Sequence, residues 1–155
     1  MISIKKILFP TDFSEFALNA LKYAISFSEQ YQAQLHCLHV VDEAYQYWMS
    51  FGPNAVPIGP GTDEILTRAK EQMDAFVAEH VREHCQSASR VVLGRPYAEI
   101  CRQAKHLDID LIVMTTHGRG GLSHLLLGST AEKVVRHAPC PVLTIRHPEH
   151  EFVQP

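Results

Sequence analysis

Short apolar runs alternate along this chain with segments whose apolar residues recur every three to four positions. Five runs have the composition of buried strands, and they lie at 5–10, 33–42, 89–94, 110–116 and 141–145. Four segments between them have the period of amphipathic helices, at 11–30, 62–86, 97–107 and 129–137. Strands that alternate with helices pair in parallel, and continuous apolar strands are covered on both faces. The pattern therefore predicts a Rossmann-like, doubly wound α/β fold: a five-stranded parallel sheet with helices on both faces.

The alternation fits one folding unit. The chain has 155 residues, a length at which one domain buries roughly 68–70% of its unfolded surface. We expect one domain over 1–147 and a loose tail over 148–155. Residues 43–61 are rich in proline, glycine and aromatic side chains, so we expect a long loop there that is functional or mobile.

Charge and hydropathy restrict the class of partner. The formal net charge is −3 and the pI is near 6.3, so no overall positive field attracts nucleic acid or an anionic membrane. No apolar run reaches membrane-spanning length, and Met1–Pro10 has no secretory leader pattern. These observations favour a cytoplasmic protein that binds neither nucleic acid nor membrane.

The cysteines and histidines give only a weak indication of a metal. Four cysteines are spread along the chain without a CxxC pair, so we interpret them as reduced and mostly buried thiols. His80, His84 and Cys85 fit one face of the helix predicted over 62–86, but two histidines at this spacing without a further partner are weak evidence. We therefore expect no metal site.

The most unusual stretch is "THGRGGLSHLLLGSTAEKVV", residues 116–135. Four glycines, Gly118, Gly120, Gly121 and Gly128, lie within eleven positions. Glycine is the residue that loses most conformational freedom on folding, and it is favoured where the backbone bends sharply or approaches a ligand closely. We expect Gly118 to turn the chain out of the fourth strand.

A helix start follows these glycines. Ser129 and Glu132 have the spacing of a capping box, which predicts a helix beginning at Ser129. Free backbone N–H groups and the positive end of the helix dipole form an anion site there, and Gly128 lets a phosphate approach. The alternative carries equal weight from the residues alone: glycines after a strand often form plain turns, and many capped helices bind nothing.

A second polar segment, Pro10, Thr11 and Asp12, follows the first strand. In doubly wound sheets, ligands bind beyond the carboxyl ends of the strands where the strand order reverses. If the first and fourth strands are neighbours at that point, both polar segments face one crevice. Asp12 and Ser14 are also possible helix N-caps, a role that is compatible with a ligand contact through the backbone of Asp12.

Several blocks of the sequence together resemble the universal stress protein family. They are "KKILFPTDFSE", "LHVVDE", "GRPYAEI" and "DLIVMTTHGRGGLSHLLLGSTAEKVVRHAPCPVLTI", and they extend from Lys5 to Arg146. The resemblance implies a five-stranded α/β fold, a homodimer and, for one branch of the family, ATP binding. That branch has glycine, two residues, glycine, nine residues, then glycine with serine or threonine. Gly118, Gly128 and Ser129 match the pattern, whereas Thr115 occupies the position of the first glycine.

The resemblance also implies which residues line the ligand, ATP, with any Mg²⁺ carried by the nucleotide. The adenine and ribose side is expected at Pro10, Thr11, Asp12 and Val40. Met114 and Thr115, at the end of the fourth strand, are expected along the ribose and phosphates together with Gly118 and Arg119. The phosphates themselves are expected at Gly128, Ser129 and Thr130. For Val40 the alternative is core packing, and for Arg119 it is a solvated loop charge.

The leading hypothesis is a stress-response sensor or regulatory partner that binds ATP. The alternatives are a dimeric interaction protein of the same family that binds no nucleotide, which Thr115 favours, and an ATP-dependent enzyme. The sequence has no GKS or GKT motif and no evident catalytic triad or carboxylate pair. We therefore expect no dedicated catalysis and at most slow ATP hydrolysis. The resemblance also implies that the terminal strand, Pro141–Ile145, pairs antiparallel with its twofold mate in the homodimer, which would close an otherwise exposed edge.

Overall fold

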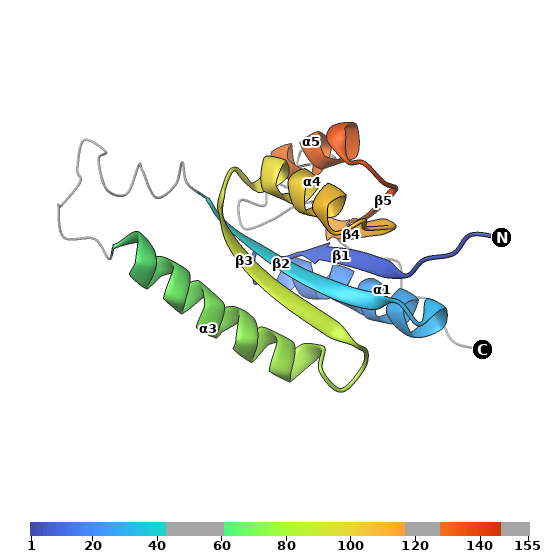
Figure 1. Cartoon of the computed structure of the whole chain (residues 1–155), viewed down its shortest axis with the longest axis horizontal. Coiled ribbons are helices and arrows are strands. Elements are labelled where there is room, and N and C mark those ends of the chain that lie inside the picture. Colours follow the sequence, from blue (N-terminus) through green and yellow to red (C-terminus); the bar gives the residue numbers. More distant parts are fainter. Residues whose placement is uncertain (43–60, 117–127, 147–155) are drawn as a thin grey trace.

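The computed structural model describes residues 1–42, 61–116 and 128–146 of the chain (Figure 1). Strands and helices alternate throughout, as the apolar pattern predicts. The elements are β1 (Lys6–Pro10), α1 (Glu15–Tyr31), β2 (Gln34–Asp42), α3 (Thr62–His80), β3 (Ser87–Gly94), α4 (Pro96–His106), β4 (Leu111–Thr115), α5 (Ser129–His137) and β5 (Val142–Ile145).

The described strands form one five-stranded parallel sheet in the order β3-β2-β1-β4-β5. From β1 the chain adds strands in one direction as far as β3, then crosses back to place β4 on the other side of β1. The predicted α/β fold with a five-stranded parallel sheet is confirmed. The reversal lies between β1 and β4, so those two strands flank the switch point at which doubly wound sheets bind ligands.

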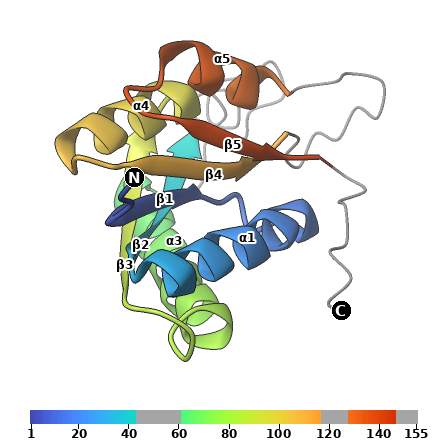
Figure 2. The same ribbon diagram turned by 90° about the vertical axis from the view of Figure 1, so that its right-hand side faces the viewer.

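Two hydrophobic clusters hold the helices against opposite faces of the sheet. Figures 1 and 2 show α1 and α3 on one face and α4 and α5 on the other. Alternate residues of β1 serve the two clusters: Ile7 and Phe9 pack towards α1 and α3, and Leu8 packs towards α4 and α5. All three are at most 1% exposed, which explains why β1 is apolar at consecutive rather than alternate positions over Ile7–Phe9.

The helix predicted over 62–86 is too long, since α3 ends at His80. Val81 leaves the helical conformation at φ −124° and ψ −43°, and its side chain is buried in the α1 and α3 cluster. The chain then turns into β3, which begins at Ser87 rather than at the predicted residue 89. Backbone pairing with β2, from Leu35 opposite Ser87 onwards, extends the strand through residues that have no apolar pattern.

Some predictions fall on residues that the structure does not describe. Of the predicted loop over 43–61, only Gly61 lies within the described ranges, where it is the N-cap of α3. The predicted tail over 148–155 lies outside them. The division into one domain over 1–147 stays a prediction.

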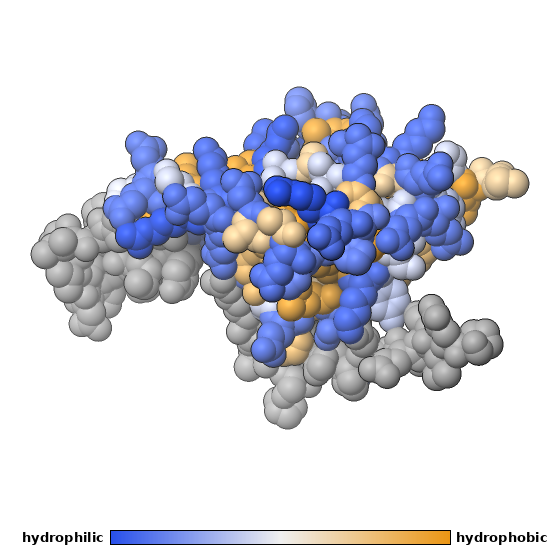
Figure 3. Space-filling model, turned by 90° about the horizontal axis from the view of Figure 1, so that it is seen from below, coloured by the Kyte–Doolittle hydropathy of each residue, from blue (hydrophilic) through white to orange (hydrophobic). Residues whose placement is uncertain are grey.

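The surface of the described residues follows the amphipathic pattern of the helices. Figure 3 shows one face on which hydrophilic side chains predominate and hydrophobic ones gather near the middle. Within the described ranges, no helix combines the length and hydropathy that a membrane span requires. All four cysteines are free thiols, of which Cys37 is buried.

Candidate functional site

The polar segments after β1 and β4 lie side by side, as the hypothesis of a shared crevice requires. β1 pairs with β4 through Ile7 opposite Leu111 and Leu8 opposite Ile112. Continued along the strands, this register sets Pro10 beside Met114 and Thr11 beside Thr115. The carboxyl ends of both strands therefore meet at one edge of the sheet.

A tight turn leads from β1 into α1. The backbone N–H of Thr11 extends the sheet by donating to Leu38 O at 2.8 Å, and the Thr11 hydroxyl accepts from the N–H of Phe13 at 3.0 Å. The Asp12 carboxylate accepts from Ser14 twice, from the N–H at 3.0 Å and from the hydroxyl at 2.6 Å. Ser14 is the N-cap and accepts from the N–H of Ala17 at 3.3 Å. Asp12 therefore supports the cap residue rather than capping α1 itself.

Phe13 adds a feature at this turn that the sequence did not indicate. Its φ is +61°, a left-handed conformation that is uncommon for a bulky residue and is associated with functional sites. The Phe13 ring lies against His39, with ring centroids 4.4 Å apart, and against Phe76 at 5.6 Å. His39 Nδ1 lies 2.8 Å from Thr11 O. Aromatic rings thus fix the backbone of the turn that follows β1.

The start of α5 is tied directly to the end of β4. The N–H of Gly128 donates to Thr116 O at 2.6 Å, and the N–H of Thr116 donates to Ile145 O at 3.0 Å. Thr116 is 6% exposed. The first turn of α5 is therefore anchored at the same edge of the sheet as Thr11.

α5 begins at Ser129 as predicted, but the predicted capping box is wrong, because the N-cap is Gly128. Gly128 has φ −68° and ψ 154°, its carbonyl accepts from the N–H of Glu132 at 2.9 Å, and no side chain caps the helix. The Glu132 carboxylate instead accepts from Arg136, one turn later. Because the first helical hydrogen bond is donated by Glu132, the backbone N–H groups before it in the first turn have no partner within the helix, and they have the geometry that binds anions at helix starts.

Of the other predicted site residues, some pack in the core, one lies at the end of β4, and two are not described. Val40 is half-buried and packs with the α4 and α5 cluster, as does Met114, which is 6% exposed. Their side chains therefore serve the core, which agrees with the packing alternative for Val40. Thr115 is half-buried at the end of β4. Gly118 and Arg119 lie outside the described residues.

The weak metal candidate is not assembled. α3 ends at His80, so His84 and Cys85 do not continue its helical face. The His80 ring packs against Phe76 at 5.1 Å, and His84 Nδ1 lies 3.8 Å from a Glu29 oxygen. The described ranges contain no cluster of three or more His, Cys, Asp and Glu side chains suited to a metal ion.

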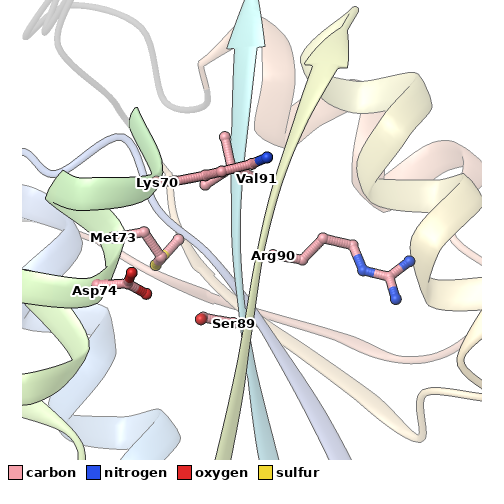
Figure 4. A pocket seen from close by; sticks show the side chains of 6 residues that line it. All are labelled: Lys70, Met73, Asp74, Ser89, Arg90 and Val91. Atoms are coloured by element: carbon pink, nitrogen blue, oxygen red, sulfur yellow. The ribbon is translucent and has the colours of Figure 1, made fainter. Parts of the chain in front are cut away.

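A groove of about 320 Å³ lies elsewhere, between α3 and the edge strand β3 (Figure 4). Lys70, Met73 and Asp74 line it from α3, and Ser89 and Val91 from β3. Two strands separate β3 from β4, so this groove is not part of the crevice at the switch point.

Comparisons with known proteins agree with this architecture. The profile of the universal stress protein family matches residues 3–146. Universal stress protein MJ0531 of Methanocaldococcus jannaschii is 32% identical over 152 residues, which make up 95% of this chain and 85% of that protein. The solved structure of protein MJ0577 from the same organism superposes with a TM-score of 0.79 at 32% identity, covering 94% of this chain and 98% of that one. UspA from Lactobacillus plantarum superposes with a TM-score of 0.69 at 29% identity, covering 94% and 100% of the two chains.

Proposed function

This chain belongs to the universal stress protein family, and from that premise we propose that it binds ATP in the crevice at the carboxyl ends of β1 and β4. ATP binding would make it a stress-response sensor or regulatory partner, with at most slow hydrolysis of the bound nucleotide. Any Mg²⁺ arrives with the nucleotide. We place the protein in the cytoplasm.

One observation carries the proposal: the hydrogen bond from Gly128 N–H to Thr116 O. It holds the first turn of α5, which has no side-chain cap, next to the end of β4. Backbone N–H groups at a helix start donate to phosphate oxygens, and the helix dipole favours negative charge there. Because the same edge carries Thr11 from β1, a phosphate chain at α5 can continue into a ribose and a base over β1 and β2.

We assign the residues of this site from the family pattern. Gly128, Ser129 and Thr130 contact the phosphates, the latter two with hydroxyl donors as well as backbone N–H groups. Pro10, Thr11, Asp12 and the half-buried Val40 lie on the adenine and ribose side. Met114, Thr115, Gly118 and Arg119 line the stretch between the two.

The nucleotide assignment rests on this crevice. A universal stress protein from Archaeoglobus fulgidus has been solved in complex with dAMP, but it shares 19% identity with this chain, with a TM-score of 0.63. At that low sequence identity, the structural similarity supports a common fold and nothing about the ligand. The uncapped helix start of α5 is the local argument for a phosphate ligand.

We also propose that β5 forms the homodimer interface. β5 is an edge strand of the described sheet, and exposed edges attract further strands. Ile112 and Thr116 of the β4 side donate to the carbonyls of Pro141 and Ile145. Since hydrogen-bonding direction alternates along a strand, the N–H of Thr144 points to the open edge. Antiparallel pairing with a second copy would satisfy it.

The test is isothermal titration calorimetry of the full chain with ATP and, separately, with adenosine. We expect one ATP per chain and much weaker binding of adenosine, because adenosine has no phosphate to contact α5. The absence of saturable binding at millimolar ATP contradicts the proposal. It would favour the second candidate, a dimeric interaction protein without a nucleotide, for which Thr115 in place of the first motif glycine is the observation.

A further inference from the structure

A second polar cavity lies on the α4 face of the sheet, away from the crevice. It has a volume of about 110 Å³, and the residues that define its chemistry are Leu8, His36, Leu38, Arg90, Gln103 and Leu107. His36 is the third residue of β2, Gln103 lies in the last turn of α4, and Leu107 is the C-cap of that helix. The cavity is thus near the amino ends of the strands, whereas the proposed nucleotide crevice is at their carboxyl ends.

One wall of this cavity has a polar atom without a partner. His36 Nε2 is buried and has no hydrogen-bond partner among the described residues. His36 lies between Leu8 of β1 and Ala88 of β3 in the sheet register, so its backbone position is fixed on both sides. Buried polar atoms in proteins are nearly always hydrogen-bonded, and an exception calls for a ligand or an ordered water.

Two cations stand close to His36 and are held by neutral acceptors. Arg90 Nη1 donates to Gln103 Oε1 at 2.9 Å, and Gln103 is 2% exposed. Figure 4 shows the Arg90 side chain leaving β3 on the side opposite Met73 and Asp74. Lys6 Nζ donates to Leu107 O at 2.8 Å. The guanidinium has five N–H donors, so the single bond to Gln103 leaves others for a ligand.

The charge of this cavity is therefore positive. Among the described residues that line it, none is a carboxylate. Asp110, at the same end of the sheet, accepts from the backbone N–H groups of Lys5 and Lys6. Burial, followed by Lys6 and then Arg90, holds the pKa of His36 below its ordinary value. A negative ligand would reverse the effect of both cations on His36.

We propose that this cavity binds a small tetrahedral oxyanion, with Arg90 and His36 Nε2 donating hydrogen bonds to it. Gln103 acts as a positioning residue, because its buried amide oxygen fixes the guanidinium. The volume is several times the roughly 30 Å³ that one water occupies in the liquid, so it accommodates a phosphate-sized ion. Arg90 is exposed along the edge strand, which provides an entry. The ion is either free in solution or the head of a small phosphate monoester.

Sulfate is the first probe, because its charge is constant between pH 5.5 and 8. The full chain is titrated with sodium sulfate at constant ionic strength set by chloride, and the His36 ring resonances are followed by NMR, with His36→Gln used for their assignment. We expect saturable shifts, a higher pKa of His36 in the bound state, and affinity that rises as the pH falls. Inorganic phosphate and phenyl phosphate then distinguish the two sources: equal affinity indicates an open site for monoesters, and loss of phenyl phosphate binding indicates a site for the free ion.

Arg90→Gln is the decisive variant, and Arg102→Gln is its matched control. Both arginines are exposed, but Arg102 is paired with Glu99 at 2.6 Å. We expect at least tenfold weaker sulfate binding in Arg90→Gln and no change in Arg102→Gln. The proposal is overturned if the wild type shows no saturable shift, which means that water alone fills the cavity. It is also overturned if Arg90→Gln binds sulfate as the wild type does, or if the Gly128→Asp change at the crevice abolishes the His36 response. ATP binding is measured in parallel, and either result can fail without the other.

Discussion

Replacing Gly128 by Asp should stabilise the empty protein and abolish ATP binding. Gly128 has φ −68° and ψ 154°, a conformation that any residue adopts, so the backbone does not require a glycine there. Asp at an N-cap accepts hydrogen bonds from the next N–H groups and is better than Gly by a few tenths of a kcal/mol. Its charge at the helix start adds about 0.3–1 kcal/mol. Together these terms predict a Tm higher by about 1–4 °C.

The same carboxylate opposes a bound phosphate in two ways. It occupies the N–H groups of the first turn of α5, and it lies within about 5 Å of any phosphate that they would hold. At that separation, repulsion amounts to about 3 kcal/mol with an effective dielectric constant of about 20. We therefore expect ATP to bind at least about a hundredfold more weakly. A rise in Tm with a loss of affinity excludes misfolding as the cause.

The chain offers a matched control in Gly61. It is the N-cap of α3, has φ −61° and ψ 158°, and also lacks a side-chain cap. A Cβ built on Gly61 meets nothing within 4 Å. Gly61→Asp should raise the Tm similarly and leave ATP affinity unchanged. Calorimetric titrations and thermal unfolding of both variants make the comparison. If Gly128→Asp binds ATP within twofold of the wild type, no phosphate approaches Gly128 and the assignment of α5 fails.

Three further predictions concern assembly, chemistry and pH. Light scattering should show a dimer of about twice 17.5 kDa. Thr144→Pro removes the N–H on the open edge of β5 and should give a folded monomer, whereas a wild-type monomer at micromolar concentration refutes this interface. Phosphate release from ATP should be far slower than the median enzyme rate of about 10 per second, since the described segments 10–14, 114–116 and 128–132 contain no lysine or arginine to stabilise the transition state. Fast release that a mutation in these segments abolishes would reveal a missed catalytic group. Burial, and next Cys85, raises the pKa of the Cys37 thiol from 9.0 to about 12, so the folded state keeps a proton that the unfolded state loses. Stability should accordingly fall by up to about 1.4 kcal/mol per pH unit between pH 9 and 12, and denaturant titrations should show a shallower fall in Cys37→Ala.

The order of the elements and the polar segments that follow β1 and β4 could be predicted from the sequence because both depend on local patterns. Uninterrupted apolar runs such as Ile7–Phe9 indicate strands buried on both faces, whatever their neighbours are. The polar residues Thr11 and Thr115 follow such runs directly. The sequence did not fix that β1 and β4 are adjacent; this depended on the rule for doubly wound sheets, and the strand order confirms it.

The errors lie where tertiary packing overrides a local pattern. Nothing in the sequence around His80 resembles a helix stop, and α3 ends because Val81 is drawn into the core at 1% exposure. Ser129 is a better N-cap than Gly128 by intrinsic preference. The helix starts at Ser129 as predicted, but Gly128, which is bonded to Thr116, is the N-cap, so Ser129 and Glu132 do not form the predicted capping box.

Other features depend on partners far apart in the sequence. The positive φ of Phe13 is held by rings from β2 and α3, namely those of His39 and Phe76. The cavity beside His36 exists because β3 and α4 bring Arg90 and Gln103 to the same face. From the sequence, His36 and His39 are only histidines in a mainly apolar strand, which indicates neither the cavity beside His36 nor the ring contact of His39 with Phe13.

The strand order has a mechanical consequence. β1 and β4 share two paired positions, whereas β1 and β2 share five and β2 and β3 share eight. The sheet therefore has a short seam at its centre, and its β1 side and β4 side are the units most easily separated in a local opening. A nucleotide held by Thr11 on one side and by α5 on the other would link the two sides of that seam and oppose their separation. Its occupancy would then be reported by slower amide hydrogen exchange at the paired positions of β1 and β4, such as Ile7 and Ile112, which are not among the proposed ligand contacts.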